Sequence, residues 1–196
     1  KDLGKICNIH IKAFPNFFLT KLGYRFIFNY YYHYFERKEI IVLIIDDMDR
    51  CIGFAAGIAN SKEFYKSIKK KWYKFLIPIL LAMLNIKLLP YLIKKVFNLL
   101  TFNRINNQVK NTHDYCELTS IAIIQEFQKK GYGSILLSRY IKEVRNTYNH
   151  LKGIILTTDF YDNKKVHYLY QKIGFKLDLN FNQSKNRKMS LYKYLF

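Results

Sequence analysis

Cysteine is scarce in this sequence, with three residues in 196. Cys7, Cys51 and Cys116 are far apart, odd in number and without any CxxC pair. A disulfide scaffold needs more cysteines, and a zinc site needs ligands at closer spacing. The pattern argues against both, predicts no bound metal and favours a reducing, cytoplasmic setting.

Acidic residues are also few: 14 Asp and Glu stand against 33 Lys and Arg, for a net charge of +19. A basic surface attracts phosphates, nucleic acids or anionic membranes. The alternative is compositional bias, because lysine, asparagine, isoleucine and the aromatics are abundant throughout. Half of the residues are hydrophobic, which argues against a disordered chain and is enough for the core of one domain.

No apolar run is long enough to cross a membrane. A spanning helix needs about 20 mostly apolar residues, and the longest uncharged run, residues 75–86, is shorter. It lies in a strongly apolar region, residues 62–102, that opens with lysines. We interpret this region as a helical insertion. Either its helices form a cover or a homodimer surface, or they lie on a membrane surface, since Trp and Lys flank the apolar residues.

The remaining segments alternate between helical and strand periodicity. We predict a helix ended by Pro15, a second helix capped by Thr20, and an antiparallel hairpin whose turn carries three Asp residues. The later segments alternate strand and helix, so the expected class is mixed α/β. The predicted helices are residues 3–14, 20–37, 131–148 and 163–173, and the predicted strands are residues 40–45, 52–59, 115–124, 153–158, 175–179 and 188–195.

A glycine-containing loop stands between the predicted strand 115–124 and the helix that follows. The first turn of a helix has unpaired N–H groups and a partial positive charge, and glycine lets the backbone approach an anion closely. This loop is therefore a candidate cradle for a pyrophosphate. Its residues are Gln128, Lys129, Lys130, Gly131, Tyr132, Gly133 and Ser134.

Other nucleotide-binding motifs fit the loop less well. A dinucleotide fingerprint has a third glycine where this chain has Leu136. A P-loop needs Gly-Lys-Ser/Thr, which the sequence lacks here.

A second segment about thirty residues later has a fixed order of residues: Asn163, Val166, Tyr170, Gly174 and Phe175. Together with the QxxGxG loop and the strand LTSIAI at residues 118–123, it resembles the GCN5-related N-acetyltransferase (GNAT) superfamily. The resemblance implies a GNAT fold: a mixed central sheet flanked by helices, with the insertion between the hairpin and the fourth strand. One domain would cover residues 1–196, and the first strand of the family would precede Lys1.

The resemblance implies acetyl-CoA as the cofactor, bound in a V-shaped opening between the fourth and fifth strands. The backbone of Ile121 and Ile123 would pair with its pantetheine arm, and the Ile121 N–H would polarise the thioester carbonyl. The N–H groups of residues 128–134 would hold the pyrophosphate, and Asn163 would reach the cofactor from the last helix.

Two residues are candidates for catalysis. Tyr170 would protonate the departing thiolate, because a phenol is still protonated at neutral pH; the alternative is a core tyrosine. Glu117 matches the catalytic base of some members, and burial would raise the pKa of its carboxyl. The alternatives are a strand-end salt bridge, or a water chain in place of a single base.

The acceptor side is predicted from the turn that contains Pro15. His10, Phe14, Phe17 and Phe18 would contact the substrate, although a packed turn between helices explains the same residues. The basic, aromatic last strand would form one wall.

We therefore expect an enzyme that transfers acetyl from acetyl-CoA to a primary amine of a small acceptor, with an anionic amino sugar as the example. No nucleic acid partner is expected, and the location is cytoplasmic, with peripheral membrane contact through residues 62–102 as an option. The alternatives are acetylation of a protein or peptide, and an inactive basic module that binds membrane or nucleic acid.

Overall fold

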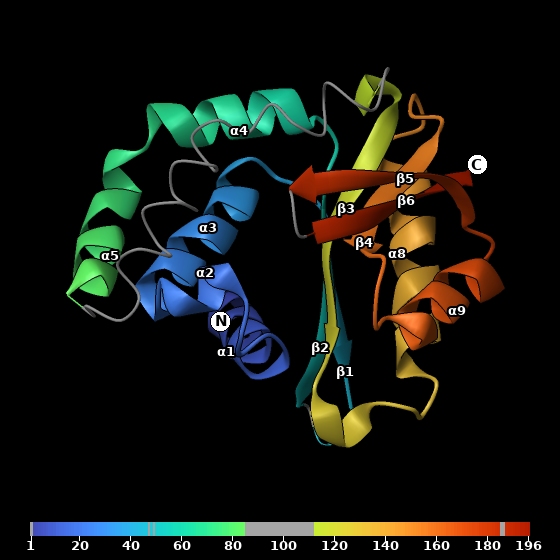
Figure 1. Cartoon of the computed structure of the whole chain (residues 1–196), viewed down its shortest axis with the longest axis horizontal. Helices are drawn as coiled ribbons and strands as arrows, with labels where there is room; N and C mark the ends of the chain where they lie inside the picture. Colours follow the sequence, from blue (N-terminus) through green and yellow to red (C-terminus); the bar gives the residue numbers. More distant parts are fainter. Residues whose placement is uncertain (1, 47, 49, 85–111, 185–186) are drawn as a thin grey trace. The chain divides into compact units, whose positions relative to one another are not determined.

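The computed structural model of the chain describes residues 2–46, 48, 50–84, 112–184 and 187–196. The chain divides into two compact units. The first comprises residues 1–38 and 62–110, and the second comprises residues 39–61 and 111–196. Figure 1 shows the first as a group of helices and the second as a sheet with its own helices.

The first unit begins with helix α1 (Asp2–Ala13), as predicted. The single helix expected from Thr20 is wrong, because the chain forms α2 (Phe18–Lys21) and then α3 (Tyr24–Glu36). Gly23 separates them at φ +88°, a left-handed conformation that breaks a helix. Thr20 caps no helix; its hydroxyl donates to the Phe14 carbonyl at 2.7 Å.

The predicted insertion contributes two described helices, α4 (Ser61–Lys70) and α5 (Tyr73–Met83). Phe75 of α5 packs with Phe18, Leu22 and Phe26 in a buried apolar cluster. Residues 85–102 of the insertion lie outside the described residues. Among the helices of the described ranges, none is both long and apolar enough to cross a membrane.

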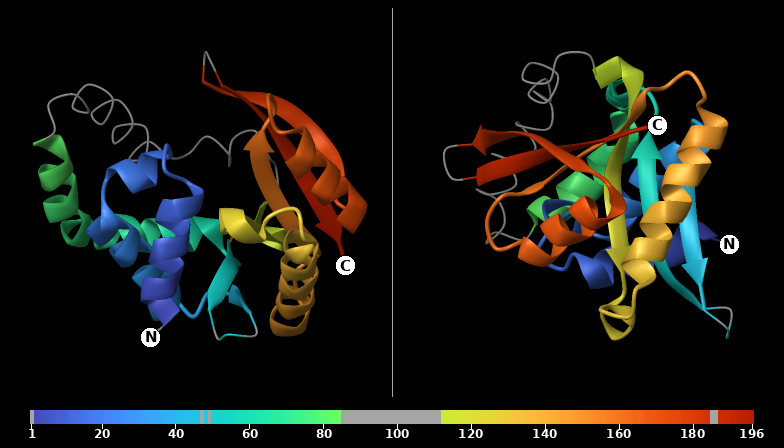
Figure 2. Two further views of the ribbon diagram at one scale, coloured as in Figure 1. Left: turned by 90° about the horizontal axis from the view of Figure 1, so that it is seen from below. Right: turned by 90° about the vertical axis from the view of Figure 1, so that its right-hand side faces the viewer.

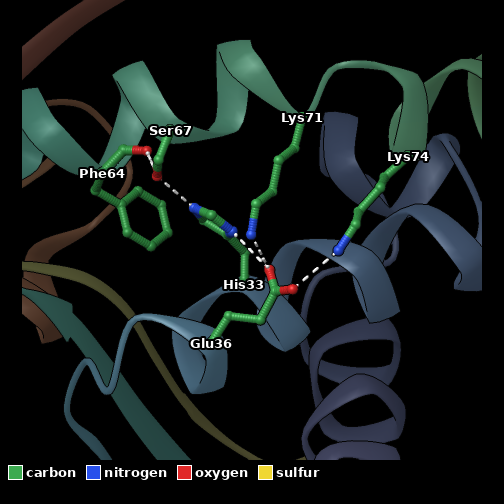
Figure 3. Close-up of polar contacts among 6 residues, drawn as sticks. All are labelled: His33, Glu36, Phe64, Ser67, Lys71 and Lys74. Atoms are coloured by element: carbon green, nitrogen blue, oxygen red, sulfur yellow. Dashed lines mark hydrogen bonds and ion pairs between the residues drawn. The ribbon is translucent and has the colours of Figure 1, made fainter.

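A polar cluster holds α4 and the start of α5 on α3 (Figure 3). The Glu36 carboxylate accepts from Lys71 at 3.0 Å and from Lys74 at 2.9 Å, and the pKa of this carboxyl falls to about 2, chiefly because of the Lys74 hydrogen bond. His33 lies between Glu36 and Ser67, at 3.1 and 2.6 Å. Charged hydrogen bonds of this kind are stronger than neutral ones.

The second unit is built on a mixed sheet with the order β1-β2-β3-β4-β6-β5 in the described residues. β3 and β4 are parallel, and every other neighbouring pair is antiparallel. β5 is longer than predicted because its polar second half pairs with β6. The strands are β1 (Ile41–Ile45), β2 (Cys51–Ile58), β3 (Tyr115–Ile123), β4 (Gly153–Asp159), β5 (Lys176–Ser184) and β6 (Arg187–Leu195).

Helices α8 (Tyr132–Thr147) and α9 (Lys164–Ile173) lie against the same face of this sheet (Figure 2, right). Leu136, Leu137, Tyr140 and Val144 of α8 are fully buried against the strands. Short 3-10 turns, Thr112–Asp114 and Gln125–Phe127, precede and follow β3. The predicted mixed α/β class is confirmed.

Candidate functional site

Strands β3 and β4 are paired only over their first halves. Their parallel pairing ends at Leu118 opposite Leu156. β3 continues through residues 119–123, paired with β2, and β4 continues through residues 157–159, paired with β6. The sheet therefore opens between the two strands.

A bulge in β3 lies where this opening begins. Leu118 pairs with Gly57 and Ser120 with Ala56, the preceding residue of β2, so Thr119 is the extra residue. Its hydroxyl donates to the Ala56 carbonyl at 2.9 Å. One extra residue shifts the alternation of side chains by one position. As a result, the apolar side chains on both sides of the bulge pack on the same core: Cys116, Leu118, Ile121 and Ile123.

The backbone of β3 beyond the bulge offers hydrogen-bonding groups to the opening. The Ile124 N–H donates to the Ile52 carbonyl of β2 at 2.9 Å. Because strand backbone groups alternate in direction, Ile121 and Ile123 direct theirs away from β2. The Ile123 carbonyl accepts the Gln128 side-chain amide at 2.9 Å, so Gln128 fastens the following loop to the strand.

The loop from Lys129 to Gly131 leads into α8 with two left-handed residues. Lys129 has φ +62°, and Gly131, the N-cap, has φ +84°. Such residues orient successive N–H groups toward one concave side, which attracts anions. The N–H groups of Gln128 and Ser134 donate to the Gln125 and Gly131 carbonyls. We therefore narrow the candidate cradle to the N–H groups of residues 129–133, which have no backbone partner among the described residues.

The beginning of α9 is fastened to the end of β4. Asn163 is the N-cap of α9, and its carbonyl accepts from Val166 and His167. Its side-chain amide donates to the Thr158 hydroxyl at 2.5 Å. Asn163 therefore stands beside the opening, at the strand that forms one of its sides, and its contact with the cofactor stays a prediction.

Tyr170 points from α9 into the core of the sheet and is 5% exposed. Its ring packs against Phe175 and Tyr192, with centroids 5.8 and 5.7 Å away. Burial, and secondarily Tyr192, raises the pKa of the Tyr170 phenol. The hydroxyl has no hydrogen-bond partner in the described part of the chain. A phenol in this state keeps its proton at neutral pH; its role as a proton donor stays a prediction.

Sequence reasoning assigned no role to His167, which the structure links to Tyr192. The Nε2–H of His167 donates to the Asp159 carbonyl at 3.1 Å, because a carbonyl only accepts. Nδ1 then accepts the Tyr192 hydroxyl at 2.8 Å. The Tyr192 hydroxyl therefore donates its hydrogen bond to His167, whereas the Tyr170 hydroxyl has no partner among the described residues.

Cys116 and Leu118 of β3 pack in the core on the side of α8. Because side chains alternate along a strand, that of Glu117 points to the opposite face of the sheet. The Ser61 hydroxyl donates to its carboxylate. Burial raises the pKa of the Glu117 carboxyl, and the Ser61 hydrogen bond opposes this in part. A carboxylate with a raised pKa is a better proton acceptor near neutral pH.

The four predicted acceptor residues all belong to the helical unit. His10 is 2% exposed, and its Nδ1 shares a hydrogen bond of 2.8 Å with the Tyr31 hydroxyl. Its Nε2 has no partner in the described ranges. Burial lowers the pKa of His10 to about 4, so the ring is neutral. Phe14 packs on His10, Phe17 is 48% exposed, and Phe18 is buried in the helical core. Their contact with a substrate stays a prediction, and Phe18 already has a packing role.

Sequence comparison adds independent information. The sequence model described as the acetyltransferase (GNAT) family matches residues 3–175, which takes in parts of both units. No curated protein is similar enough in sequence to count as a match.

Solved structures of this fold superpose on nearly the whole chain. An acetyltransferase of the GNAT family from Bacillus cereus is 14% identical, with TM-score 0.57 and coverage of 99% and 90% of the two chains. A chimera of the spermidine N-acetyltransferase SpeG from Vibrio cholerae and hSSAT is 16% identical, with TM-score 0.56 and the same coverage. The ribosomal-protein-S18-alanine N-acetyltransferase of Escherichia coli is 13% identical, with TM-score 0.52 and coverage of 99% and 87%. At these identities the likeness concerns the fold.

Proposed function

Because the chain belongs to the GNAT family and is an acetyltransferase that uses acetyl-CoA, we propose that it acetylates a primary amine of a small anionic acceptor, such as an amino sugar. The observation that carries the donor side is the opening between β3 and β4, together with the N–H groups at the start of α8, which have no backbone partner among the described residues. The support for an anionic acceptor is the net charge of +19.

The cofactor supplies an acetyl group activated as a thioester. In the proposed reaction the N–H groups of residues 129–133 hold its pyrophosphate, and the Ile121 N–H polarises the carbonyl of the thioester. Glu117 takes a proton from the acceptor amine as nitrogen bonds to the carbonyl carbon. The carbon–sulfur bond breaks, and Tyr170 donates its proton to the sulfur. Glu117 lies on the last paired stretch of β3 and β4, just before the opening begins, and we propose that it acts on the acceptor amine from there.

The role of Glu117 predicts a specific pH dependence. Glu117 acts only when ionised, so activity falls as the pH drops through its raised pKa. Removing the Ser61 hydroxyl takes away the hydrogen bond that lowers this pKa, so Ser61→Ala shifts the acidic limb of the kcat/KM profile to higher pH. Glu117→Gln lowers the rate about 100-fold and abolishes that limb. An unshifted limb in Ser61→Ala would assign it to another group, such as the acceptor amine.

A thiol-release assay with acetyl-CoA tests the acceptor. The panel contains amino sugars, amino-sugar phosphates, polyamines, amino acids and peptides. We expect the highest kcat/KM with an anionic amino sugar, and kcat/KM should fall as salt screens the attraction. Faster release with peptides would favour the alternative of a protein acetyltransferase. Binding of acetyl-CoA without release for any amine would instead indicate an inactive binding module.

The three cysteines are present as thiols, which supports a cytoplasmic location. This location and the amino-sugar acceptor are both part of the proposal.

A further inference from the structure

Helix α5 presents an apolar face to solvent. On its inner side Phe75 is 7% exposed and packs in the helical core. Its outer side carries large apolar residues that are 51% to 76% exposed: Trp72, Tyr73, Ile77, Leu80, Leu81 and Leu84. They recur every three or four residues, so they form one continuous stripe. Contiguous exposed apolar surface of this kind marks an interaction site.

The stripe continues into a groove of about 430 Å³ between α3 and α5. Ile77 belongs to both the stripe and the groove, and Pro78 lines the groove beside it. The opposite wall is formed by Tyr24 and Phe28 of α3, which are 43% and 37% exposed. The apolar surface is therefore shared by two helices that pack together.

The charged groups at this surface are basic. Arg25 lines the groove, is exposed and has no ion-pair partner among the described residues. Lys74 lines the groove as well, although Glu36 pairs with it. Lys69 and Lys70 are exposed and end α4, two residues before the stripe begins at Trp72. None of the described residues that line the groove is acidic.

We propose that this face, the α5 stripe with the α3–α5 groove, docks on the surface of a membrane that contains anionic phospholipid. A helix of 11 residues is too short to span a bilayer and would lie in its interface. Tryptophan and tyrosine at the base of the stripe suit the headgroup level, and Arg25, Lys69 and Lys70 meet the lipid phosphates.

The basic groups also favour a membrane over a second copy of the chain. A twofold dimer through this face would bring the same patch of each copy together. Arg25, Lys69 and Lys70 of both copies would then gather at one interface, and like charges at an interface are unfavourable. An anionic lipid surface neutralises them instead.

The chain contains a single tryptophan, Trp72, so its fluorescence reports on this face directly. The protein is mixed with vesicles of phosphatidylcholine alone or of phosphatidylcholine and phosphatidylglycerol in equal parts. With the anionic vesicles we expect a blue shift of the emission, protection from aqueous iodide and co-sedimentation. With phosphatidylcholine alone, partitioning should be weaker by on the order of tenfold or more.

Three variants separate the apolar and basic contributions. Leu80→Glu combined with Leu81→Glu should weaken partitioning at least about 100-fold, since both side chains would otherwise enter the interface. Lys69→Gln combined with Lys70→Gln should weaken it on the order of 25-fold, on anionic vesicles only. Met48→Glu, in the β1–β2 turn and 72% exposed, is the matched control and should bind as the wild type does.

Other occupants of the face give different results. A blue shift without vesicles that grows with protein concentration, together with doubled mass in sedimentation equilibrium, would show a second copy and overturn the proposal. An unchanged Trp72 spectrum with anionic vesicles would overturn it as well. The acetyl-CoA thiol-release assay is run without vesicles, so failure of the proposed acetyl transfer is recognised separately.

Discussion

Tyr170→Phe lowers kcat by about 100- to 10,000-fold, the usual contribution of a general acid, and leaves the affinity for acetyl-CoA almost unchanged. The substitution removes one hydroxyl and keeps the ring, which packs against Phe175 and Tyr192. Because the hydroxyl has no partner among the described residues, its loss breaks no hydrogen bond there. Steady-state kinetics gives kcat, and calorimetry gives the affinity.

The matched control is Tyr168→Phe on the same helix. Tyr168 is 66% exposed, so the loss of its hydroxyl should change neither quantity. Equal losses of kcat and acetyl-CoA affinity in Tyr170→Phe would show that Tyr170 contributes by packing rather than by proton transfer.

Gly131→Val removes measurable binding of acetyl-CoA in calorimetry, a loss of at least about 100-fold. Gly131 has φ +84°, which a β-branched residue adopts only with strain, so the loop must change conformation. The N–H groups of residues 129–133 then no longer converge. Two or three hydrogen bonds to a charged group, at about 1.5–3 kcal/mol each, account for the loss.

Two controls separate this effect from general strain. A Cβ at Gly131 would meet no atom within 4 Å, and asparagine tolerates a left-handed conformation, so Gly131→Asn should retain most of the affinity. Gly23→Val places the same residue at φ +88° in the helical unit; it should lower the melting temperature without changing affinity. Full acetyl-CoA affinity in Gly131→Val would refute the cradle.

The periodicity of the sequence was sufficient for most elements, but it failed at the second helix. The apolar spacing of residues 20–37 continues through Gly23 as if one helix were present, and only the positive φ of Gly23 breaks it into α2 and α3. The length of β5 was also underestimated. Its second half is polar, and pairing with β6 rather than burial keeps it in the sheet.

The bulge in β3 has a signal in the sequence that lies outside the GNAT motifs. Apolar residues in β3 occur at Cys116 and Leu118 and then at Ile121 and Ile123, so the two-residue alternation slips by one position at Thr119. A slip of this kind within a strand is typical of a bulge. It marks the place where β3 leaves β4, and hence the opening itself.

The anion cradle is predicted by the sequence alone, because a loop with Gly131 before an amphipathic helix has unpaired N–H groups that depend only on nearby residues. The roles of Asn163 and Tyr170 are predicted by the resemblance of residues 163–175 to the GNAT family. Only the tertiary structure shows that the Tyr192 hydroxyl is bound to His167, while the Tyr170 hydroxyl has no partner among the described residues. The exposed apolar face of α5 was also decided by the tertiary structure alone. Burial and pairing between distant segments depend on which surfaces meet, and residue spacing along one chain does not specify that.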